Sequence, residues 1–405
     1  MLLRRACLAG LTGSLAFAQD RLPPIRALTR GPKFHWFGYY DKLEFDPSGR
    51  YVLGMEVGFQ HRSPKPDDVI KVGMVDTQDG DRWIELGESR AWNWQQGCML
   101  QWLPGSKTEV IWNDRQGDRF ISYILDTKTG KKRTIPAPIY AVSPDGTWAV
   151  SPDFRRLNDT RPGYGYAGLP DPHANLQAPA DAGIWKVDLR TGRQKLIFSF
   201  ADAARIPNPH GDFGQAKHWF NHLLVSPDGR RFIFLHRWRG PKEGKSFATR
   251  MFTANANGSQ LHVIDPYGKT SHFIWRDPRH VLAWAWHPSQ GDKFYLYQDQ
   301  TTRAEAVAPG VMTVNGHCSY LPGNRWILND TYPDKQRMQH PYLYNLATNL
   351  QHPLGHFYSA PEYTGEWRCD THPRFSPDGR KVVIDSAHGG NGRQLYMIDI
   401  GSIVG

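Results

Sequence analysis

The sequence is poor in cysteine, and it contains no apolar run long enough to cross a membrane. Of the four cysteines in 405 residues, Cys7 lies in a segment that we expect to be removed. The remaining Cys98, Cys318 and Cys369 are odd in number, which excludes a disulfide framework as the organising principle of the fold. A single bridge stays open, and its pairing is not assigned. Because no later segment reaches the length of a membrane span, we expect no membrane partner.

Runs of lysine or arginine and nucleic-acid-binding motifs are also absent. The formal net charge is nevertheless +10. This excess of positive charge needs an explanation, such as an anionic partner. Without such a run or motif, nucleic acid is not expected as a partner. An anionic substrate drawn in by the summed positive field fits the charge better, although a merely basic soluble protein is the simple alternative. The oligomeric state is not indicated.

The first residues have the features of a secretory signal peptide rather than of a folded segment. Arg4 and Arg5 form a positive n-region, and residues 6–16 form a short stretch of small and apolar residues. Ala16-Phe17-Ala18 gives the cleavage pattern of small residues. We therefore predict that residues 1–18 are a signal peptide and that the mature protein, from Gln19, is periplasmic or secreted.

What recurs along the chain is a proline-containing turn followed by a strand. Proline at the second position fixes φ, and glycine or aspartate allows the tight reversal, so each turn predicts a hairpin. Apolar or alternating strands follow most of the turns, and no convincing amphipathic helix of ordinary length is found. The turns are Asp46-Pro47-Ser48-Gly49, Leu103-Pro104-Gly105, Ser143-Pro144-Asp145-Gly146, Ser226-Pro227-Asp228-Gly229, Asp277-Pro278-Arg279, Leu321-Pro322-Gly323 and Ser376-Pro377-Asp378-Gly379.

Seven such units, spaced 40 to 83 residues apart, predict an all-β fold, a seven-bladed β-propeller with four strands in each blade. We expect residues 19–405 to form this single domain. The longest interval, between the third and fourth turns, contains residues 155–180, which are rich in arginine, glycine, proline and tyrosine. This segment is too long for a hairpin loop, so we expect an insertion that lies over one face.

Four histidines stand four or five residues before the turns of four consecutive units. Because the innermost strand of each blade lines the central channel, these imidazoles are expected to meet near the axis. A single such histidine is more often structural, but imidazole is also a common metal ligand. Asp370 would add an oxygen ligand on the strand face of His372. We therefore predict a metal site here and place the other histidines, including His218 and His236, in loops or at the surface. The four histidines are His222, His272, His317 and His372.

Seven segments in a fixed order resemble a known family. They are His35-Trp-Phe-Gly-Tyr-Tyr-Asp-Lys42, Asn221-His222, His236-Arg-Trp-Arg-Gly-Pro, Thr249-Arg250-Met251-Phe252, Ser271-His272-Phe273-Ile274-Trp275, Gly316-His317-Cys318-Ser319 and Thr371-His372-Pro373-Arg374-Phe375-Ser376. Together they are similar to the oligogalacturonate lyases and, more broadly, to the propeller-type uronate lyases. The resemblance covers most of the mature chain. It implies a lyase that cleaves the bond to C4 of a uronic acid in an acidic oligosaccharide or polysaccharide by β-elimination.

The resemblance also implies roles for individual residues. His317 and His372 would bind a divalent metal, usually Mn²⁺, Arg250 would be the base, and His272 would lie beside the reacting sugar. The sequence departs from the family where a glutamine and a second histidine are replaced by Trp367 and Asp370. An oxygen donor from Glu366 or Asp370 could restore the ligand count and shift the preference toward Ca²⁺ or another hard cation. The substrate is then galacturonate, or glucuronate as in rhamnose-capped or ulvan-type glycans.

Residue chemistry leaves the identity of the base open. A metal held by His317, His372 and Asp370 would neutralise the uronate carboxylate, and a base must then reach the proton on C5. A guanidinium normally keeps its proton, so Arg250 is either an unusual base or a carboxylate clamp beside His272 or His222 as the base. The resemblance favours Arg250 as the base.

Several further residues are candidates for binding the substrate. Tyrosines offer aromatic surfaces for sugar rings, and arginines of the insertion offer cations for carboxylates, although packing between blades and a solvated basic loop are equal alternatives. A non-catalytic periplasmic scaffold or a glycan-binding protein is the main competing class, but neither needs histidines in register. A sialidase-like hydrolase is disfavoured because its Asp-box signature is missing. The candidates are His35, Tyr39, Tyr40, Arg155, Tyr164 and Tyr166.

Overall fold

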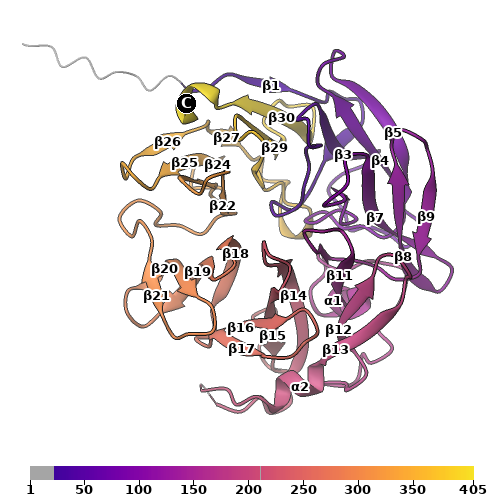
Figure 1. Cartoon of the computed structure of the whole chain (residues 1–405), viewed down its shortest axis with the longest axis vertical. Coiled ribbons are helices and arrows are strands. Elements are labelled where there is room, and N and C mark those ends of the chain that lie inside the picture. The colour runs from indigo at the N-terminus through magenta and orange to yellow at the C-terminus, as the bar shows by residue number, and fades with distance from the viewer. Residues whose placement is uncertain (1–21, 210) are drawn as a thin grey trace, which may run out of the picture.

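The computed structural model describes residues 22–209 and 211–405, and the predicted signal peptide lies outside them. Seven four-stranded antiparallel sheets form a ring around a common axis (Figure 1). The prediction of an all-β, seven-bladed propeller is therefore confirmed. No helix in the described part of the chain has both the length and the apolar character needed to cross a membrane.

The first three blades follow one another along the chain, each built from the axis outward. The first contains β2 (Phe34–Trp36), β3 (Tyr51–Val57), β4 (Ile70–Asp76) and β5 (Arg82–Ser89). The second contains β6 (Gln101–Trp102), β7 (Glu109–Gln116), β8 (Arg119–Asp126) and β9 (Lys132–Ile135). The third contains β10 (Ala141–Val142), β11 (Trp148–Pro152), β12 (Gly183–Asp188) and β13 (Gln194–Ser199).

The next three blades repeat this plan. The fourth contains β14 (Lys217–Val225), β15 (Arg231–Arg239), β16 (Ala248–Asn255) and β17 (His262–Asp265). The fifth contains β18 (Thr270–Asp277), β19 (His280–His287), β20 (Gly291–Gln298) and β21 (Ala304–Ala306). The sixth contains β22 (Ser319–Tyr320), β23 (Trp326–Asn329), β25 (Tyr342–Asn345) and β26 (Gln351–Pro353), and beside it β24 (Met338–Gln339) pairs with β27 (Phe357–Tyr358).

The seventh blade joins the two ends of the described chain. Its inner three strands come from the C-terminal part, and the outermost, β1, pairs antiparallel with β30. The ring is thus closed by main-chain hydrogen bonds between segments far apart in sequence. The strands are β28 (Arg374–Phe375), β29 (Lys381–Ser386), β30 (Gln394–Asp399) and β1 (Ile25–Ala27).

Each predicted turn joins the innermost strand of a blade to its second strand, so the seven turns lie at one end of the ring. Helices are short, as the sequence indicated. They are α1 (Phe154–Thr160), α2 (Phe200–Arg205), α3 (Gly401–Val404) and the 3₁₀ turn Gly365–Trp367. The long segment between β11 and β12 begins with α1. Asp153 caps this helix by accepting hydrogen bonds from the backbone N–H groups of Arg155 and Arg156.

The core lies between blades, because the middle strands are covered on both faces by their neighbours. In β15 the first eight of nine residues are buried. The outer strand β9 instead exposes Lys132 and Arg133, and such charges discourage edge-to-edge pairing with another chain. Cys98, Cys318 and Cys369 are all buried free thiols, so the bridge that the sequence left open is not formed.

Candidate metal and catalytic site

The four histidines in register lie together at the axis, on or just before the innermost strands of blades four to seven. The ring centroids of His272 and His317 are 4.2 Å apart, and those of His317 and His372 are also 4.2 Å apart. His222 lies 6.4 Å from His272. We call this group, together with the side chains that contact it, the axial cluster.

His317 is held in one orientation by a carboxylate. Asp330, just beyond the end of β23, accepts hydrogen bonds from the backbone N–H of His317 (2.7 Å) and from its ring Nδ1 (2.9 Å). The same carboxylate accepts a hydrogen bond from the hydroxyl of Thr371 at 2.5 Å. Since Nδ1 carries the proton, Nε2 presents its lone pair. This carboxylate–histidine arrangement is the usual outer shell of a metal-binding imidazole.

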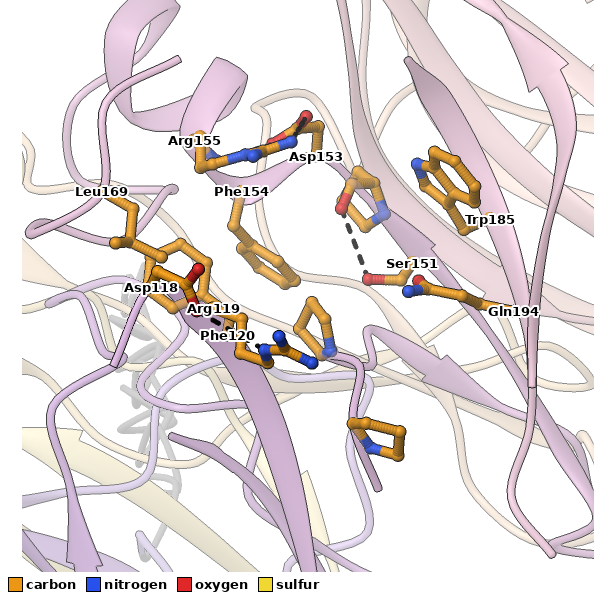
Figure 2. Close-up of a pocket in the computed structure, with 13 residues that line it drawn as sticks. Asp118, Arg119, Phe120, Ser151, Asp153, Phe154, Arg155, Leu169, Trp185 and Gln194 are labelled. Carbon is orange, nitrogen blue, oxygen red and sulfur yellow. Dashed lines mark hydrogen bonds and ion pairs between the residues drawn. The ribbon is translucent and has the colours of Figure 1, made fainter. Parts of the chain in front are cut away.

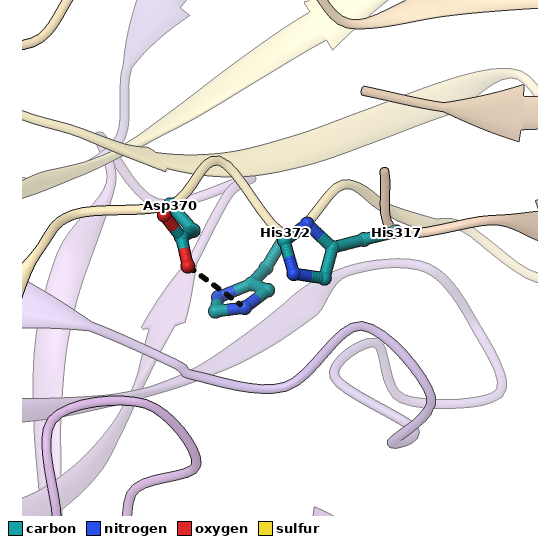
Figure 3. Close-up of side chains that lie close together, drawn as sticks. All are labelled: His317, Asp370 and His372. Carbon is teal, nitrogen blue, oxygen red and sulfur yellow. Dashed lines mark ion pairs between the residues drawn. The ribbon is translucent and has the colours of Figure 1, made fainter. Parts of the chain in front are cut away.

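The nitrogen that His317 presents has no hydrogen-bond partner among the described residues, and the same is true of Nε2 of His372. Both atoms are buried, and an unpaired buried polar atom is costly. Ligand atoms of His317, His372 and Asp370 all lie within 4.8 Å of one another. Figure 3 shows the three side chains gathered in one place. Two imidazole nitrogens and one carboxylate oxygen form a donor set that fits a divalent cation.

The backbone at two of these histidines is in the left-handed region, which non-glycine residues rarely adopt. His222 has φ 50° and His372 has φ 39°. At His222 the register with β15 shifts between Asn221 and Leu223, so a β-bulge aims this side chain. Residues held in such conformations gather at functional sites, because the surrounding structure must force them.

His222 and His272 differ from the other two histidines in that both of their ring nitrogens have partners. Nδ1 of His222 lies 3.2 Å from the side-chain amide nitrogen of Gln96, which donates to it, and its Nε2 lies 3.3 Å from the Tyr39 hydroxyl. Nδ1 of His272 donates to the Asn315 side-chain oxygen at 3.0 Å. The Nε2 lone pair of His272 therefore faces the Tyr332 hydroxyl, 3.4 Å away.

Burial keeps three of these imidazoles neutral. Desolvation is the largest cause that lowers the pKa of His222, His272 and His372 well below the usual value, and neighbouring positive groups lower it further. The positive charge of Arg368 lowers the pKa of all three histidines, and that of Arg161 lowers the pKa of His222. Neutral imidazole is the form that binds metals and accepts protons.

Two of the candidate tyrosines form a wall of the cluster. The Tyr39 ring stacks on His222, with centroids 4.9 Å apart. Tyr40 packs against His317 at 5.4 Å, and its hydroxyl donates to the carbonyl of Phe273 at 2.8 Å. Both tyrosines are buried, so their rings pack against the histidines rather than offer an open platform for a sugar.

The predicted insertion reaches the cluster through Tyr164. Its ring lies edge-on to His222 at 5.5 Å, and its hydroxyl oxygen accepts a hydrogen bond from Arg368 Nη2 at 2.8 Å. Arg161 lies over the same ring at 3.9 Å. Burial alone would raise the pKa of Tyr164, but the two guanidinium groups outweigh it and lower that pKa below its ordinary value.

Tyr332, Arg368 and Asp330 belong to the site, although sequence reasoning did not select them. Arg368 Nε also donates to Asp370 at 2.7 Å, so one guanidinium connects Asp370 to Tyr164. Tyr332 and Arg368 are partly exposed, whereas the four histidines are buried. They are therefore the more exposed members of the site. An Arg-x-Asp-x-His spacing was the signal available for Arg368, although this segment lies before β28 and not on a strand.

Arg250 does not join this cluster in the structure. It lies on β16, the third strand of blade four, and is fully buried. Its Nε donates to His236 Nδ1 at 3.1 Å, and its other nitrogens donate to carbonyl oxygens at and after the end of α2, from Ala203, Ile206 and Pro207. Burial lowers the pKa of Arg250 to about 10. Its predicted role as base stays a prediction, and this environment is that of a structural cation.

Two histidines expected at the surface are buried beside Arg250, and that expectation was wrong. His236 Nε2 lies 2.8 Å from His218 Nδ1, with the rings stacked 5.0 Å apart. The two histidines lie on β15 and β14, where the strands are covered on both faces. We call His218, His236 and Arg250 the radial row, because they occupy successive strands from the axis outward.

Three other candidates for substrate binding also lie outside the axial cluster. His35 Nδ1 forms a hydrogen bond with Gln394 Oε1 at 3.0 Å, which connects the first blade to the last. Tyr166 stacks on Phe154 at 4.1 Å inside the core. Arg155 forms a bidentate ion pair with its capping residue Asp153. Of the two oxygen donors proposed from sequence, Asp370 joins the histidines. Glu366 instead contacts Ser63.

Solved structures match the chain over almost its whole length. An oligogalacturonate lyase from Vibrio parahaemolyticus is 16% identical, with 94% of each chain covered and a TM-score of 0.65. An oligogalacturonate lyase in complex with manganese is 15% identical, with 93% of each chain covered and a TM-score of 0.66. The propeller domain of a trilobed protease from Pyrococcus furiosus is 9% identical, with 90% of this chain and 94% of that chain covered and a TM-score of 0.51.

These likenesses identify the fold as a propeller like that of oligogalacturonate lyase, which the sequence resemblance predicted. At such identities they show the fold alone, and a protease propeller shares its general plan. No protein-family model matches the chain, and no curated protein matches it.

Proposed function

We propose that the protein is a metal-assisted lyase that cleaves an acidic glycan at a uronic acid by β-elimination. The observation that carries this proposal is the pair of buried, unpartnered Nε2 atoms of His317 and His372 beside Asp370. Guanidinium groups and tyrosine rings lie beside this divalent-metal donor set, and such a combination is suited to a sugar acid. The two lyase structures with the same fold support the assignment.

His317, His372 and Asp370 would hold the cation, with Asp330 orienting His317 from behind. Two imidazoles favour Mn²⁺ or a neighbouring first-row ion over Ca²⁺, which prefers about six to eight oxygen ligands. One of the lyase structures is described as a complex with manganese. When bound, such an ion supplies a Lewis acid that neutralises the uronate carboxylate and makes the C5 proton more acidic.

Tyr164 is the group best placed to take the C5 proton. Its hydroxyl oxygen accepts the Arg368 N–H at 2.8 Å, and Arg161 lies over its ring. Both contacts stabilise a phenolate, which is a proton acceptor of suitable strength. His222 is less suitable because Gln96 already donates to its Nδ1, which leaves a proton on Nε2.

Tyr332 is the proposed proton donor to the departing O4 oxygen, with His272 Nε2 holding its hydroxyl at 3.4 Å. In the balanced step, the C5–H proton passes to the Tyr164 oxygen and the C4–O4 bond breaks. The electron pair from C5–H forms the C4–C5 double bond, and O4 leaves with the proton from Tyr332. Proton transfer to a neutral His272 is not needed in this scheme.

The substrate is proposed to be galacturonate or glucuronate within an oligosaccharide or polysaccharide, and the protein is proposed to work in the periplasm or outside the cell. Determining the N-terminal residue of the mature protein tests the second point. Export would be contradicted by a mature chain that retains residues 1–18.

The test of the lyase is the ultraviolet absorbance of a new C4–C5 double bond. Galacturonan oligomers, ulvan and rhamnose-capped arabinogalactan are offered to the protein with and without chelator. We expect product with at least one of them, and none after chelation or in His317→Ala. His352→Ala, on the outer strand β26, is the matched control and should retain activity. Full activity of the chelated protein would contradict the metal role.

The proton-transfer roles are tested separately. Tyr164→Phe should lower kcat by about a hundredfold to ten-thousandfold, and Tyr332→Phe should lower it less, because water can protonate the leaving oxygen. Equal activity of Tyr164→Phe and the parent protein would exclude Tyr164 as the base.

A non-catalytic glycan-binding protein is the second candidate, favoured by the closure of the cluster. The four histidines are exposed by no more than 4%, so a sugar must displace covering side chains to reach them. Binding of an acidic glycan without any unsaturated product would support this alternative.

A further inference from the structure

A groove lies between the second and third blades, away from the axial cluster. It opens between the β7–β8 hairpin on one side and the outer strands β12 and β13 on the other, and its volume is about 320 Å³. We call it the outer groove. Figure 2 shows Arg119 and Leu169 facing Trp185 and Gln194 across the space, with Arg155 at its rim. A cavity of this size accommodates a small ligand such as a sugar unit.

The charges at the outer groove are balanced in pairs. Arg155 binds both oxygens of Asp153 (3.0 and 2.8 Å), and Arg119 Nε lies 3.5 Å from Asp118. Two arginines and two aspartates leave no net charge. The axial cluster differs, because Arg161 and Arg368 both lie near His222 and only Arg368 is paired there with a carboxylate, that of Asp370. The outer groove is therefore not built for a carboxylate.

The side chains of Trp185 and Gln194 give the outer groove the features of a sugar-binding surface. The partly exposed Trp185 indole presents a flat apolar face, and neither its N–H nor the Gln194 side-chain amide has a hydrogen-bond partner among the described residues. The paired guanidinium and carboxylate groups place hydrogen-bond donors and acceptors side by side. This arrangement can bind adjacent hydroxyl groups of one sugar. An aromatic face with planar polar side chains around it suits the two sides of a sugar ring.

The same inserted segment lines the outer groove and the axial cluster. Arg155 and Leu169 line the groove, whereas Tyr164 contacts His222. Phe154, at the base of the groove, stacks on Tyr166 at 4.1 Å. A glycan that occupies the groove would thus bind to the element that carries the proposed base.

We infer that the outer groove binds a neutral pyranose unit of a glycan chain, separately from the site that takes the uronic acid. This inference rests on the proposed function only for the presence of an acidic unit elsewhere in the same chain. Binding of a neutral sugar needs neither metal nor turnover.

Calorimetric titration tests the inference with three neutral probes, galactotetraose, xylotetraose and cellotetraose, in the presence of chelator. We expect at least one to bind the parent protein and Trp185→Ala to weaken that binding at least about tenfold. Trp286→Ala is the control, since Trp286 is 40% exposed on β19 of another blade. It should bind within about twofold of the parent protein.

Gln194→Ala provides a second variant, which should weaken binding by a few-fold even if Trp185→Ala folds poorly. Tetragalacturonate is titrated into His317→Ala, which cannot turn it over in our scheme. The inference is overturned if no neutral probe binds, if Trp185→Ala and Gln194→Ala leave binding unchanged, or if tetragalacturonate alone depends on Trp185. Neutral binding in a protein that shows no lyase activity would retain this inference while removing the proposed function.

Discussion

The axial cluster and the radial row are both built from buried imidazoles, but their ring nitrogens are used differently. In the radial row, His236 uses both nitrogens, since Arg250 donates to one and the other lies 2.8 Å from His218. In the axial cluster, Nε2 of His317 and of His372 has no partner among the described residues. His236 is thus fully hydrogen-bonded, whereas the cluster has two ring nitrogens that the protein itself does not use.

This difference shows why histidine content alone does not locate a site. Burial lowers the pKa of imidazoles in both groups, so titration behaviour does not separate them. What separates them is that Nε2 of His317 and of His372 lacks a partner while both nitrogens of His236 have one, and an unpaired buried nitrogen calls for a further ligand. The predictions that follow test this contrast, beginning with the largest expected effect.

Removing an imidazole from the cluster should abolish metal binding. For His317→Ala the dissociation constant for Mn²⁺, measured by calorimetry, should rise by at least about a hundredfold. His236→Gln in the radial row should lower stability yet bind Mn²⁺ as the parent does. If both variants lost the metal equally, the contrast between the two groups would be incorrect.

Removing the cation of the radial row should affect stability more than catalysis. Arg250→Met leaves several buried carbonyl oxygens and His236 Nδ1 unpaired, so the free energy of unfolding should fall by about 3 kcal/mol in a denaturant titration. Arg250→Lys should restore part of it. Turnover per folded molecule should stay within about threefold of the parent value. A large loss of kcat at unchanged stability would instead support the role of base that the family resemblance implies.

Weakening the support of His317 should have a smaller effect than removing the ligand. Asp330→Asn keeps the shape but loses the charge that holds the Nδ1 proton, so Mn²⁺ affinity should fall about 10- to 100-fold. Asp334→Asn, at an exposed ion pair with His340, serves as the control and should leave the affinity unchanged. Unaltered Mn²⁺ binding in Asp330→Asn would remove the orienting role of this carboxylate.

The smallest expected effect is the acid sensitivity that comes from His218. Burial lowers its pKa to about 4, so between that value and its ordinary pKa the unfolded chain binds a proton that the folded chain refuses. The contribution of His218 to the free energy of unfolding is therefore fully present above about pH 6.5 and is lost as the pH falls. At about pH 5.5 the loss is about 1.4 kcal/mol. His218→Gln should lose correspondingly less stability between about pH 8 and about pH 5.5. An identical pH dependence in both proteins would exclude His218 as the source.

Particular residues show how far sequence reasoning reached into the site. The turn register placed His222, His272, His317 and His372 at equivalent positions of four blades, and these four do meet at the axis. Asp370 also joins them, but not through the shared strand face that the sequence suggested, because residues 368–373 precede β28 and His372 has φ 39°. By contrast, His218 and His236 were expected at the surface, because alternation along a strand does not indicate that neighbouring blades cover both of its faces.

Loop residues were the least predictable part. Tyr164 and Tyr166 are two positions apart in one insertion, yet one contacts His222 and the other packs on Phe154 in the core. Nothing in their local sequence distinguishes them, since a loop path is set by contacts with distant segments. Tyr332 joins the cluster for the same reason, through a hydroxyl that lies near His272.

The sequence by itself determined the seven repeating turns and the position of a histidine on or just before four consecutive inner strands, because the distance of each histidine from its turn is a local property of the chain. Only the tertiary structure decided which imidazoles keep a free nitrogen. That outcome depends on Asp330, Arg250 and Gln96 reaching particular rings from other segments. Hydrogen-bond completion is a property of the assembled propeller, and it separates a candidate metal site from a structural row of the same residues.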